Sequence, residues 1–266
     1  MNLGIHLRRH VVGAFLLEHL YHRLRRQLTR WRYAGRRFHC PVCDSWVRDF
    51  LPFGLPPRPH TMCPVCESVE RHRLYWLYYQ RRTDLLAPGP PRRFLHFAPE
   101  MGLQKNLRKL PCLRHVALDF VSPFVAIRAD LCCLPLADSC AQIVHCSHVL
   151  EHVADDRAAM AELYRVMEPG GWGLIQVPVW SDDPTFEDPS IIEPAERERV
   201  YGQHDHVRIY GPDVLDRLRA AGLHVTIVPA SQFLTPDECE RYAISPSEEI
   251  FHCHRPPGTT TAPARP

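Results

Sequence analysis

The sequence predicts an α/β protein in which a parallel sheet follows a small four-cysteine module and a basic helix. Short apolar runs alternate with amphipathic stretches from residue 93 onward, which is the pattern of a parallel α/β sheet. Two Cys-Pro-Val-Cys motifs precede this region, and the first 37 residues carry nine Arg and one Glu. A chain of 266 residues is long enough for one large core and one accessory module.

Composition divides the chain into four regions. Residues 1–37 are a basic arm, within which residues 3–30 suit an amphipathic helix that either packs on its own domain or contacts an anionic membrane or nucleic acid. Residues 38–90 contain the cysteine pairs, a helix and a Pro- and Gly-rich linker. Residues 91–254 contain the α/β pattern. Residues 255–266 are poor in apolar side chains, so we expect a disordered tail.

The sequence near the N-terminus has some features of a targeting signal. The apolar run at residues 11–17 is far shorter than the roughly 20 residues that cross a bilayer, so we expect no transmembrane segment. Arg8 and Arg9 precede this run, but no small-residue cleavage site follows it as in a signal peptide. The eleven cysteines do not suggest a disulfide framework. We therefore expect a cytoplasmic protein.

The periodic segments predict seven strands and four helices. The expected strands are Phe94–Phe97, His115–Phe120, Phe124–Ala129, Gln142–Ser147, Trp172–Val177, Leu223–Val228 and Glu249–His254. The expected helices are Ser68–Tyr79, Met101–Leu110, Asp156–Met167 and Pro212–Ala221. Residues 180–211 are too long for a simple connection, so we expect an insertion that covers the substrate.

The paired cysteines predict a metal site. The ligands are Cys40, Cys43, Cys63 and Cys66. Each CxxC places two thiolates on one tight turn, and two such knuckles complete the tetrahedral sulfur shell that zinc prefers. Residues 46–53 between the pairs supply a hairpin strand. Four thiolates leave no open coordination position, so the zinc is expected to be structural. Arg71 and Arg73 follow the second pair and either cap the knuckle or face a ligand.

The carboxyl ends of the parallel strands predict a nucleotide-like cofactor site. Asp119 ends the second strand, 19 residues beyond Glu100, where a carboxylate suits two ribose hydroxyls. Asp130 follows the third strand, where an acid can accept a hydrogen bond from an adenine amino group. The loop Ala98-Pro-Glu-Met-Gly102 follows the first strand.

With these motifs in order, residues 93–254 resemble the class I S-adenosylmethionine-dependent methyltransferases, in particular the methyltransferase type 11 group. The motifs are HVALDF at 115–120, RADLCCLPLAD at 128–138, IVHCSHVLEHV at 143–153 and ELYRVMEPGGWGLIQVPV at 162–179. The chain also resembles a subgroup in which a CPxC…CPxC module precedes the motif LHFAPE, here at 95–100.

The resemblance implies a Rossmann-like parallel sheet, S-adenosylmethionine as cofactor and a set of residues that bind it. That set is His96, Ala98, Glu100, Gly102, Asp119, Asp130, Leu131 and Ser147. One departure stands out, because the first loop of the family usually reads GxGxG and only the last glycine is kept here. His96 also stands where the family usually has an acid, and Glu100 is a candidate partner for the cofactor's amino group.

The candidate catalytic residues lie after the fourth and fifth strands. His148 ends the fourth strand, near the expected position of the transferred methyl group, and Glu151 and His152 begin the next helix, where they either act or cap it. The insertion contributes the polar candidates His204, His206 and Arg208, which either bind the substrate or order the insertion. A metal site made by His204, His206 and an acid is a less favoured alternative.

Two classes of acceptor fit the sequence. A small-molecule or envelope-precursor acceptor is favoured, because the insertion carries many acids that repel a phosphate backbone. These acids are Asp182, Asp183, Glu187, Asp188, Glu193, Glu196 and Glu198. The alternative is an RNA methyltransferase that binds RNA through the zinc module and the basic arm. A third possibility is a non-enzymatic zinc module on an inactive methyltransferase fold.

Overall fold

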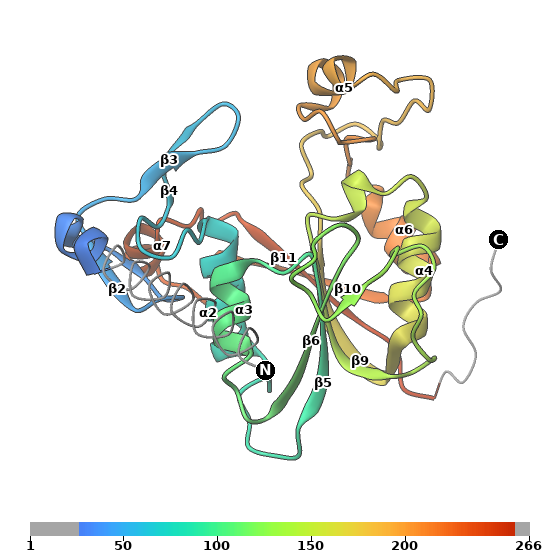
Figure 1. The fold of residues 1–266 in the computed structure, drawn as a ribbon, viewed down its shortest axis with the longest axis horizontal. Coiled ribbons are helices and arrows are strands. Elements are labelled where there is room, and N and C mark those ends of the chain that lie inside the picture. The colour runs from blue at the N-terminus through green and yellow to red at the C-terminus, as the bar shows by residue number, and fades with distance from the viewer. Residues whose placement is uncertain (1–26, 259–266) are drawn as a thin grey trace, which may run out of the picture.

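The structure, a computed structural model, describes residues 27–258. A seven-stranded sheet lies between two layers of helices, and the cysteine module continues one of these layers (Figure 1). The cysteine module contains β1 (Ala34–Cys40), β2 (Ser45–Val47), β3 (Leu51–Phe53), β4 (Arg58–Met62) and α2 (Glu70–Arg82). The α/β region contains β5 (Arg92–Phe97), α3 (Met101–Leu107), β6 (Leu113–Asp119), β7 (Ile127–Arg128), β8 (Ala141–Ser147), α4 (Asp156–Val166), β9 (Met167–Gln176), α5 (Pro194–Tyr201), α6 (Val214–Ala220), β10 (His224–Pro229), α7 (Pro236–Tyr242) and β11 (Glu249–His254).

The large sheet has the strand order β10-β11-β9-β8-β5-β6-β7. β11 runs antiparallel to both of its neighbours, and the other adjacent strands are parallel. The chain leaves β5 towards β6 and β7 and then returns to β8 on the other side of β5. The boundary between β5 and β8 is therefore the switch point at which open α/β sheets bind their ligands.

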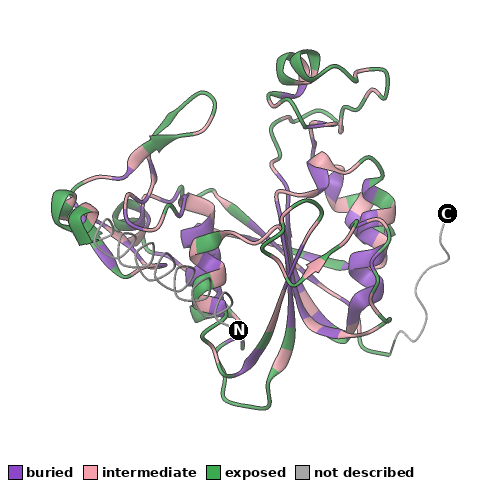
Figure 2. Ribbon diagram, viewed as in Figure 1, coloured by how far each residue is buried: buried purple, intermediate pink, exposed green. Residues whose placement is uncertain are grey.

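Side chains alternate between the two faces of the sheet and form two cores. Phe94, Ile143 and Leu174 pack against α2 and α7 in a core that also contains the apolar residues of the cysteine module. Leu95 and Val144 on the opposite face pack against α4 and α6. Figure 2 shows the resulting buried sheet, with the inward sides of α2 and α4 also buried. The cysteine module thus has no separate core.

Most of the expected elements are present, with four main differences, the first of which is that β9 begins at Met167 and not at Trp172. The strand expected at Phe124–Ala129 is reduced to the two residues of β7, and the helix expected at Met101–Leu110 ends at Leu107. The strand expected at residues 46–53 is divided, because β2 pairs with β1 and β3 pairs with β4 in two separate hairpins. The sequence also left four elements unassigned, namely β1, β4, α5 and α7.

The structure describes only part of each predicted terminal segment. Most of the basic arm, residues 1–26, and most of the tail, residues 259–266, lie outside the described residues. Within the described part, residues 27–32 are helical and Arg30 donates to the Cys43 carbonyl and to Ser45 Oγ. Among the helices of residues 27–258, none has the length and apolar character needed to cross a bilayer.

Candidate functional site

Four cysteine sulfur atoms converge at the base of the module, as the CxxC spacing predicts. Cys40 Sγ lies 3.6 Å from Cys66 Sγ, and Cys43 Sγ lies 3.8 Å from Cys63 Sγ. Sulfur atoms at about 2.3 Å from a tetrahedral zinc are about 3.8 Å apart, so this spacing fits a zinc ion. It is far longer than the about 2.05 Å of a disulfide bond.

Arg73 joins the cysteine module to the rest of the protein. Its buried guanidinium donates to the carbonyl oxygens of Thr61 and Ser68 beside the second knuckle, at 2.8 and 3.1 Å. It also donates to the carbonyl oxygens of Tyr242 and Ala243 at the end of α7, at 2.7 and 3.1 Å. Of the two arginines considered in the sequence, Arg73 therefore caps the knuckle.

The loop after β5 folds back towards the sheet. Ala98 has φ of 44°, a left-handed conformation that turns the chain sharply after the strand. Glu100 then places Oε2 2.7 Å from Nε2 of the buried His96. Gly102 packs against the cysteine module, because a Cβ there would lie 2.5 Å from Ser68 Oγ. The glycine kept in this loop thus serves a contact with the module.

A buried polar cluster spans the switch point between β5 and β8. Glu100 Oε1 lies 3.5 Å from His145 Nε2 and 3.8 Å from His72 Nε2, and none of these three atoms has a hydrogen-bond partner among the described residues. Burial opposes ionisation of Glu100, but the neighbouring His145 and His96 hold its pKa well below the ordinary value. Tyr79 closes the cluster through a 2.6 Å hydrogen bond with His145 Nδ1.

The other predicted cofactor residues lie along the same edge of the sheet. Asp119 ends β6, and its Oδ1 accepts hydrogen bonds from the backbone N–H groups of Val121 and Ser122. Asp130 accepts from the backbone of Cys132, and Ser147 at the end of β8 hydrogen-bonds with Tyr75. Leu131 is buried in the core beneath them.

Apolar side chains are exposed around this edge. Met101 in the first loop and Phe120, Val121 and Phe124 after β6 are 72%, 67%, 69% and 90% exposed. Such side chains beside the Asp119 carboxylate form the mixture of apolar surface and a few polar groups that is typical of a small-molecule site.

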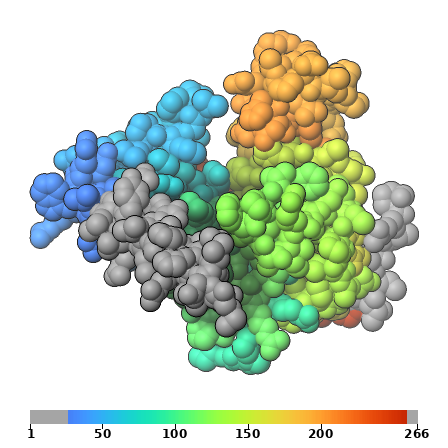
Figure 3. All heavy atoms as spheres, viewed as in Figure 1, coloured from blue at the N-terminus to red at the C-terminus, as the bar shows by residue number. Residues whose placement is uncertain are grey.

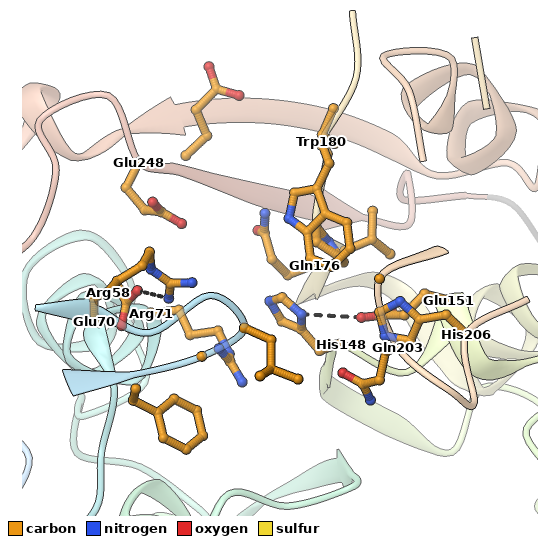
Figure 4. Close-up of a pocket in the computed structure, with 18 of the residues that line it drawn as sticks. Arg58, Glu70, Arg71, His148, Glu151, Gln176, Trp180, Gln203, His206 and Glu248 are labelled. Carbon is orange, nitrogen blue, oxygen red and sulfur yellow. Dashed lines mark hydrogen bonds and ion pairs between the residues drawn. The ribbon is translucent and has the colours of Figure 1, made fainter. Parts of the chain in front are cut away.

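A cavity of about 660 Å³ adjoins this edge at the ends of β8 and β9. One side is lined by residues 53–55 and Arg58 of the β3–β4 hairpin and by Arg71 of α2, and the other by residues 177–180, residues 202–203 and His206. Figure 3 shows the hollow between the hairpin, in blue, and the insertion, in orange. Arg71 points into this space, so one of the two arginines faces a potential ligand (Figure 4).

His148 and Glu151 form the floor of the cavity (Figure 4). His148 adopts φ of 54°, an uncommon conformation for a residue that is not glycine and one often found at functional sites. Its Nδ1 lies 3.2 Å from Oε1 of Glu151. Burial opposes ionisation of Glu151, yet the adjacent His148 keeps its pKa below the ordinary value.

Glu151 and His152 do not cap α4. They lie in a separate 3-10 turn, Leu150–His152, and α4 is capped by Asp155, whose side chain accepts from the Ala158 N–H at 2.9 Å. The sequence interpretation of Glu151 and His152 as helix caps is therefore wrong. The i, i+3 spacing of His148 and Glu151 was the signal that could have placed them together.

The candidates from the insertion lie in three different environments. His206 is buried and lines the cavity, whereas His204 is exposed and is absent from its lining. Arg208 is buried beneath the insertion, where it binds Glu187 and the carbonyl oxygens of Leu150, Val153 and Ala154.

Comparison with known proteins identifies the central part of the chain. Residues 102–175 match the family model described as a methyltransferase domain. An uncharacterised 37.1 kDa protein of transposon Tn4556 from Streptomyces fradiae is 36% identical over 106 residues, which are 38% of this chain and 29% of that protein. The matched segment thus spans less than a third of this relative.

Solved structures share the architecture at low sequence identity. The [4+2]-cyclase SpnF aligns with a TM-score of 0.50 and 17% identity over 70% of this chain and 82% of its own. An S-adenosylmethionine-dependent methyltransferase from Mesorhizobium loti aligns with a TM-score of 0.44 and 14% identity, over 68% and 98%. A cyclase shares this fold, so the reaction has to be argued from the site.

Proposed function

We propose that this chain, which carries an S-adenosylmethionine-dependent methyltransferase domain of the class I Rossmann-like fold, transfers a methyl group to a small-molecule or envelope-precursor acceptor. The cavity of about 660 Å³ beside the switch point carries this proposal. Its volume falls within the range of about 300–1,000 Å³ that is usual for small-molecule sites. Three separate parts of the chain enclose it, namely the β3–β4 hairpin, the sheet edge and the insertion.

The cofactor is proposed to lie along the carboxyl ends of β5, β6 and β8. Asp119 accepts the ribose hydroxyls, Asp130 accepts from the adenine amino group, and the exposed Phe120 and Phe124 cover apolar surface of the adenosine. The methionine end then lies by the loop after β5, with the transferred methyl group directed towards His148. This arrangement makes catalysis chiefly a matter of positioning the acceptor in line with the carbon–sulfur bond.

The acceptor is proposed to occupy the cavity, with His148 as the base where the acceptor must lose a proton. Arg58 and Arg71 lie on the hairpin side together with Glu70 and Glu248, so the walls carry charges of both signs (Figure 4). Mixed charges suit a compact polar acceptor better than a phosphate backbone, which calls for a mainly basic groove.

The RNA alternative has one supporting observation. A second cavity, of about 680 Å³, lies between the cysteine module and α3, and its basic lining residues include Arg30, Arg81, Lys105 and Lys109. RNA that copurifies with the protein, or RNA affinity that falls steeply with salt, would support this alternative.

The cysteine cluster is proposed to hold a structural zinc ion. The sulfur spacings fit a tetrahedral zinc, and four thiolates leave no position for a substrate. The zinc then stabilises the two knuckles from which the β3–β4 hairpin and α2 extend. Its contribution to function is to hold one wall of the acceptor cavity in place.

Calorimetric titration with S-adenosylmethionine tests the proposed activity. We expect wild-type protein to bind it and Asp119→Ala to bind about ten- to a hundredfold more weakly, because hydrogen bonds to a charged group contribute about 1.5–3 kcal/mol. Asp237→Ala, a change of the same kind in the first turn of α7, is the control and should bind normally. A folded wild-type protein that does not bind the cofactor would support the inactive-fold alternative.

A further inference from the structure

We propose that the acceptor cavity contains a second metal site, in which Glu151, His152 and His206 bind a divalent transition-metal cation. One potential ligand atom from each residue lies within 4.8 Å of the other two. Ligands at about 2.1 Å from a tetrahedral cation are about 3.4 Å apart, so modest side-chain rotations bring these atoms to coordination distance. The site is separate from the cysteine cluster.

Glu151 is the first observation that points to a cation. The residue is 1% exposed, and neither of its carboxylate oxygens has a hydrogen-bond partner among the described residues. His148 Nδ1 approaches one of these oxygens at 3.2 Å, a contact that becomes an ion pair only when the imidazole is protonated. A buried carboxylate is costly unless it is paired or binds a metal ion, and a cation at this place removes the cost.

The histidines are the second observation, because their ring nitrogens are disposed as in metal ligands. Asp205 Oδ2 lies 3.1 Å from His152 Nδ1, so that nitrogen carries the proton and Nε2 is left to coordinate. His206 Nδ1 is buried without a hydrogen-bond partner among the described residues, so it is left to coordinate. Outer carboxylates orient metal-binding histidines as Asp205 orients His152.

The position of the site indicates what the metal ion does. All three residues line the cavity proposed for the acceptor, and Figure 4 shows Glu151 and His206 facing it beside His148. Three protein ligands leave a coordination position open, as in catalytic rather than structural metal sites. The acceptor class is therefore a molecule that presents a hydroxyl or carboxylate oxygen. This assignment of the acceptor rests on the proposed function, whereas the metal site itself does not.

The buried cluster of His96, Glu100 and His145 also has suitable ligand types but fits a metal ion less well. Glu100 already has a 2.7 Å hydrogen bond with His96. His72 also lies beside Glu100, and its Nδ1 accepts a hydrogen bond from the Val69 N–H. Because Nδ1 is the acceptor, the proton of the neutral ring lies on Nε2, which faces Glu100 in place of a metal ion. This cluster provides the comparison for the experiment.

Titration with Co²⁺ tests the site in full-length protein that has been given a single equivalent of zinc, which the four thiolates bind first. Zinc binds more tightly than cobalt, so the cysteine site should not exchange. We expect one equivalent of Co²⁺ to bind, with visible d–d absorption and no thiolate charge-transfer band. Glu151→Gln should lose this binding, and Asp205→Asn should weaken it by about 10–100-fold because His152 is no longer held.

Two matched variants serve as controls. Glu193→Gln makes the same change at an exposed site in the insertion, and Glu100→Gln makes it in the other cluster; both should bind cobalt as wild type does. The metal site is excluded if wild type binds no cobalt, if Glu151→Gln binds normally, or if only Glu100→Gln loses binding. S-adenosylmethionine is titrated into the same preparations, so a failure of cofactor binding is seen separately from a failure of the metal site.

Discussion

At the scale of single residues, the position of Glu100 accounts for the small number of glycines in the first loop, residues 98–102. The family usually has an acid at the position that His96 occupies in this sequence. In the fold Glu100 reaches back to His96, so a carboxylate lies at this edge of the sheet although it comes from the loop. The periodicity of the sequence does not predict this contact, because the turn at Ala98 determines the direction in which Glu100 points.

The histidines beside Glu100 and His96 predict an acid-sensitive fold. Burial lowers the pKa of His72 to about 3, and burial together with the charge of His96 lowers that of His115 to about 4. An unfolded chain takes up these protons near pH 6.5, so the stability due to the neutral imidazoles is complete above that pH. It is lost as the pH falls towards the folded-state values, at up to about 1.4 kcal/mol per pH unit for each group.

Urea unfolding at pH 7 and pH 5.5 measures this loss. We expect His115→Gln to show a smaller difference between the two pH values than wild type, whereas His224→Gln on the exposed edge of β10 should match wild type. Zinc content is measured at both pH values, because zinc release also destabilises the protein in acid. Equal pH dependence in wild type and His115→Gln would show that His115 does not contribute.

At the scale of elements, strong alternation was enough to assign the central sheet. The segments that were missed are short or polar, such as α5 with its charged sequence PAERERVY and α7 with PDECERY. Neither has an apolar stripe of several turns, because each buries only one or two residues against its neighbours. The β1–β2 hairpin is likewise fixed by the cysteine knuckle rather than by local propensity.

Helix α2 depends on Arg73, and a substitution there tests this dependence. Arg73→Met keeps the unbranched apolar stem of the side chain but removes the donor to the carbonyl oxygens of Thr61, Ser68, Tyr242 and Ala243, of which Ser68 keeps the N–H of Cys63. Each unpaired buried acceptor costs about 1–3 kcal/mol, so we expect the unfolding free energy to fall by about 3 kcal/mol or more. Denaturant unfolding measures this change in the free energy of unfolding.

Arg82→Met is the control for this prediction, since Arg82 lies exposed at the end of the same helix. Its unfolding free energy should stay within about 0.5 kcal/mol of wild type. A similar loss of stability in both variants would indicate a general effect of charge on α2 rather than the loss of the four hydrogen bonds.

At the scale of the whole molecule, the cysteine module and one face of the sheet share a single core. Apolar residues of the knuckles, α2 and α7 belong to the same cluster as Phe94, Ile143 and Leu174 of the sheet. The sequence indicated two regions joined by a Pro- and Gly-rich linker, which suggests independent units. The order of the regions was predictable, but their common core was not, because it depends on the face that α2 presents to the sheet.

The shared core predicts that loss of the proposed zinc ion unfolds more than the module. Zinc binding by four thiolates stabilises small folds by about 10–16 kcal/mol, while a typical domain is stable by only about 5–15 kcal/mol. We therefore expect Cys63→Ser to expose the α2 face of the sheet and to abolish binding of S-adenosylmethionine, although Cys63 lies in the knuckle and not at the cofactor edge. Scanning calorimetry and cofactor titration measure the two effects.

Cys133→Ser provides the matched control, because Cys133 is exposed and lies outside the cysteine cluster. This variant should keep the wild-type unfolding temperature, zinc content and cofactor affinity. In wild type, the module and the sheet should unfold in one transition, since neither has a complete core without the other. Two well-separated transitions, with the sheet unaffected in Cys63→Ser, would show instead that the zinc module is an independent attachment to the catalytic domain.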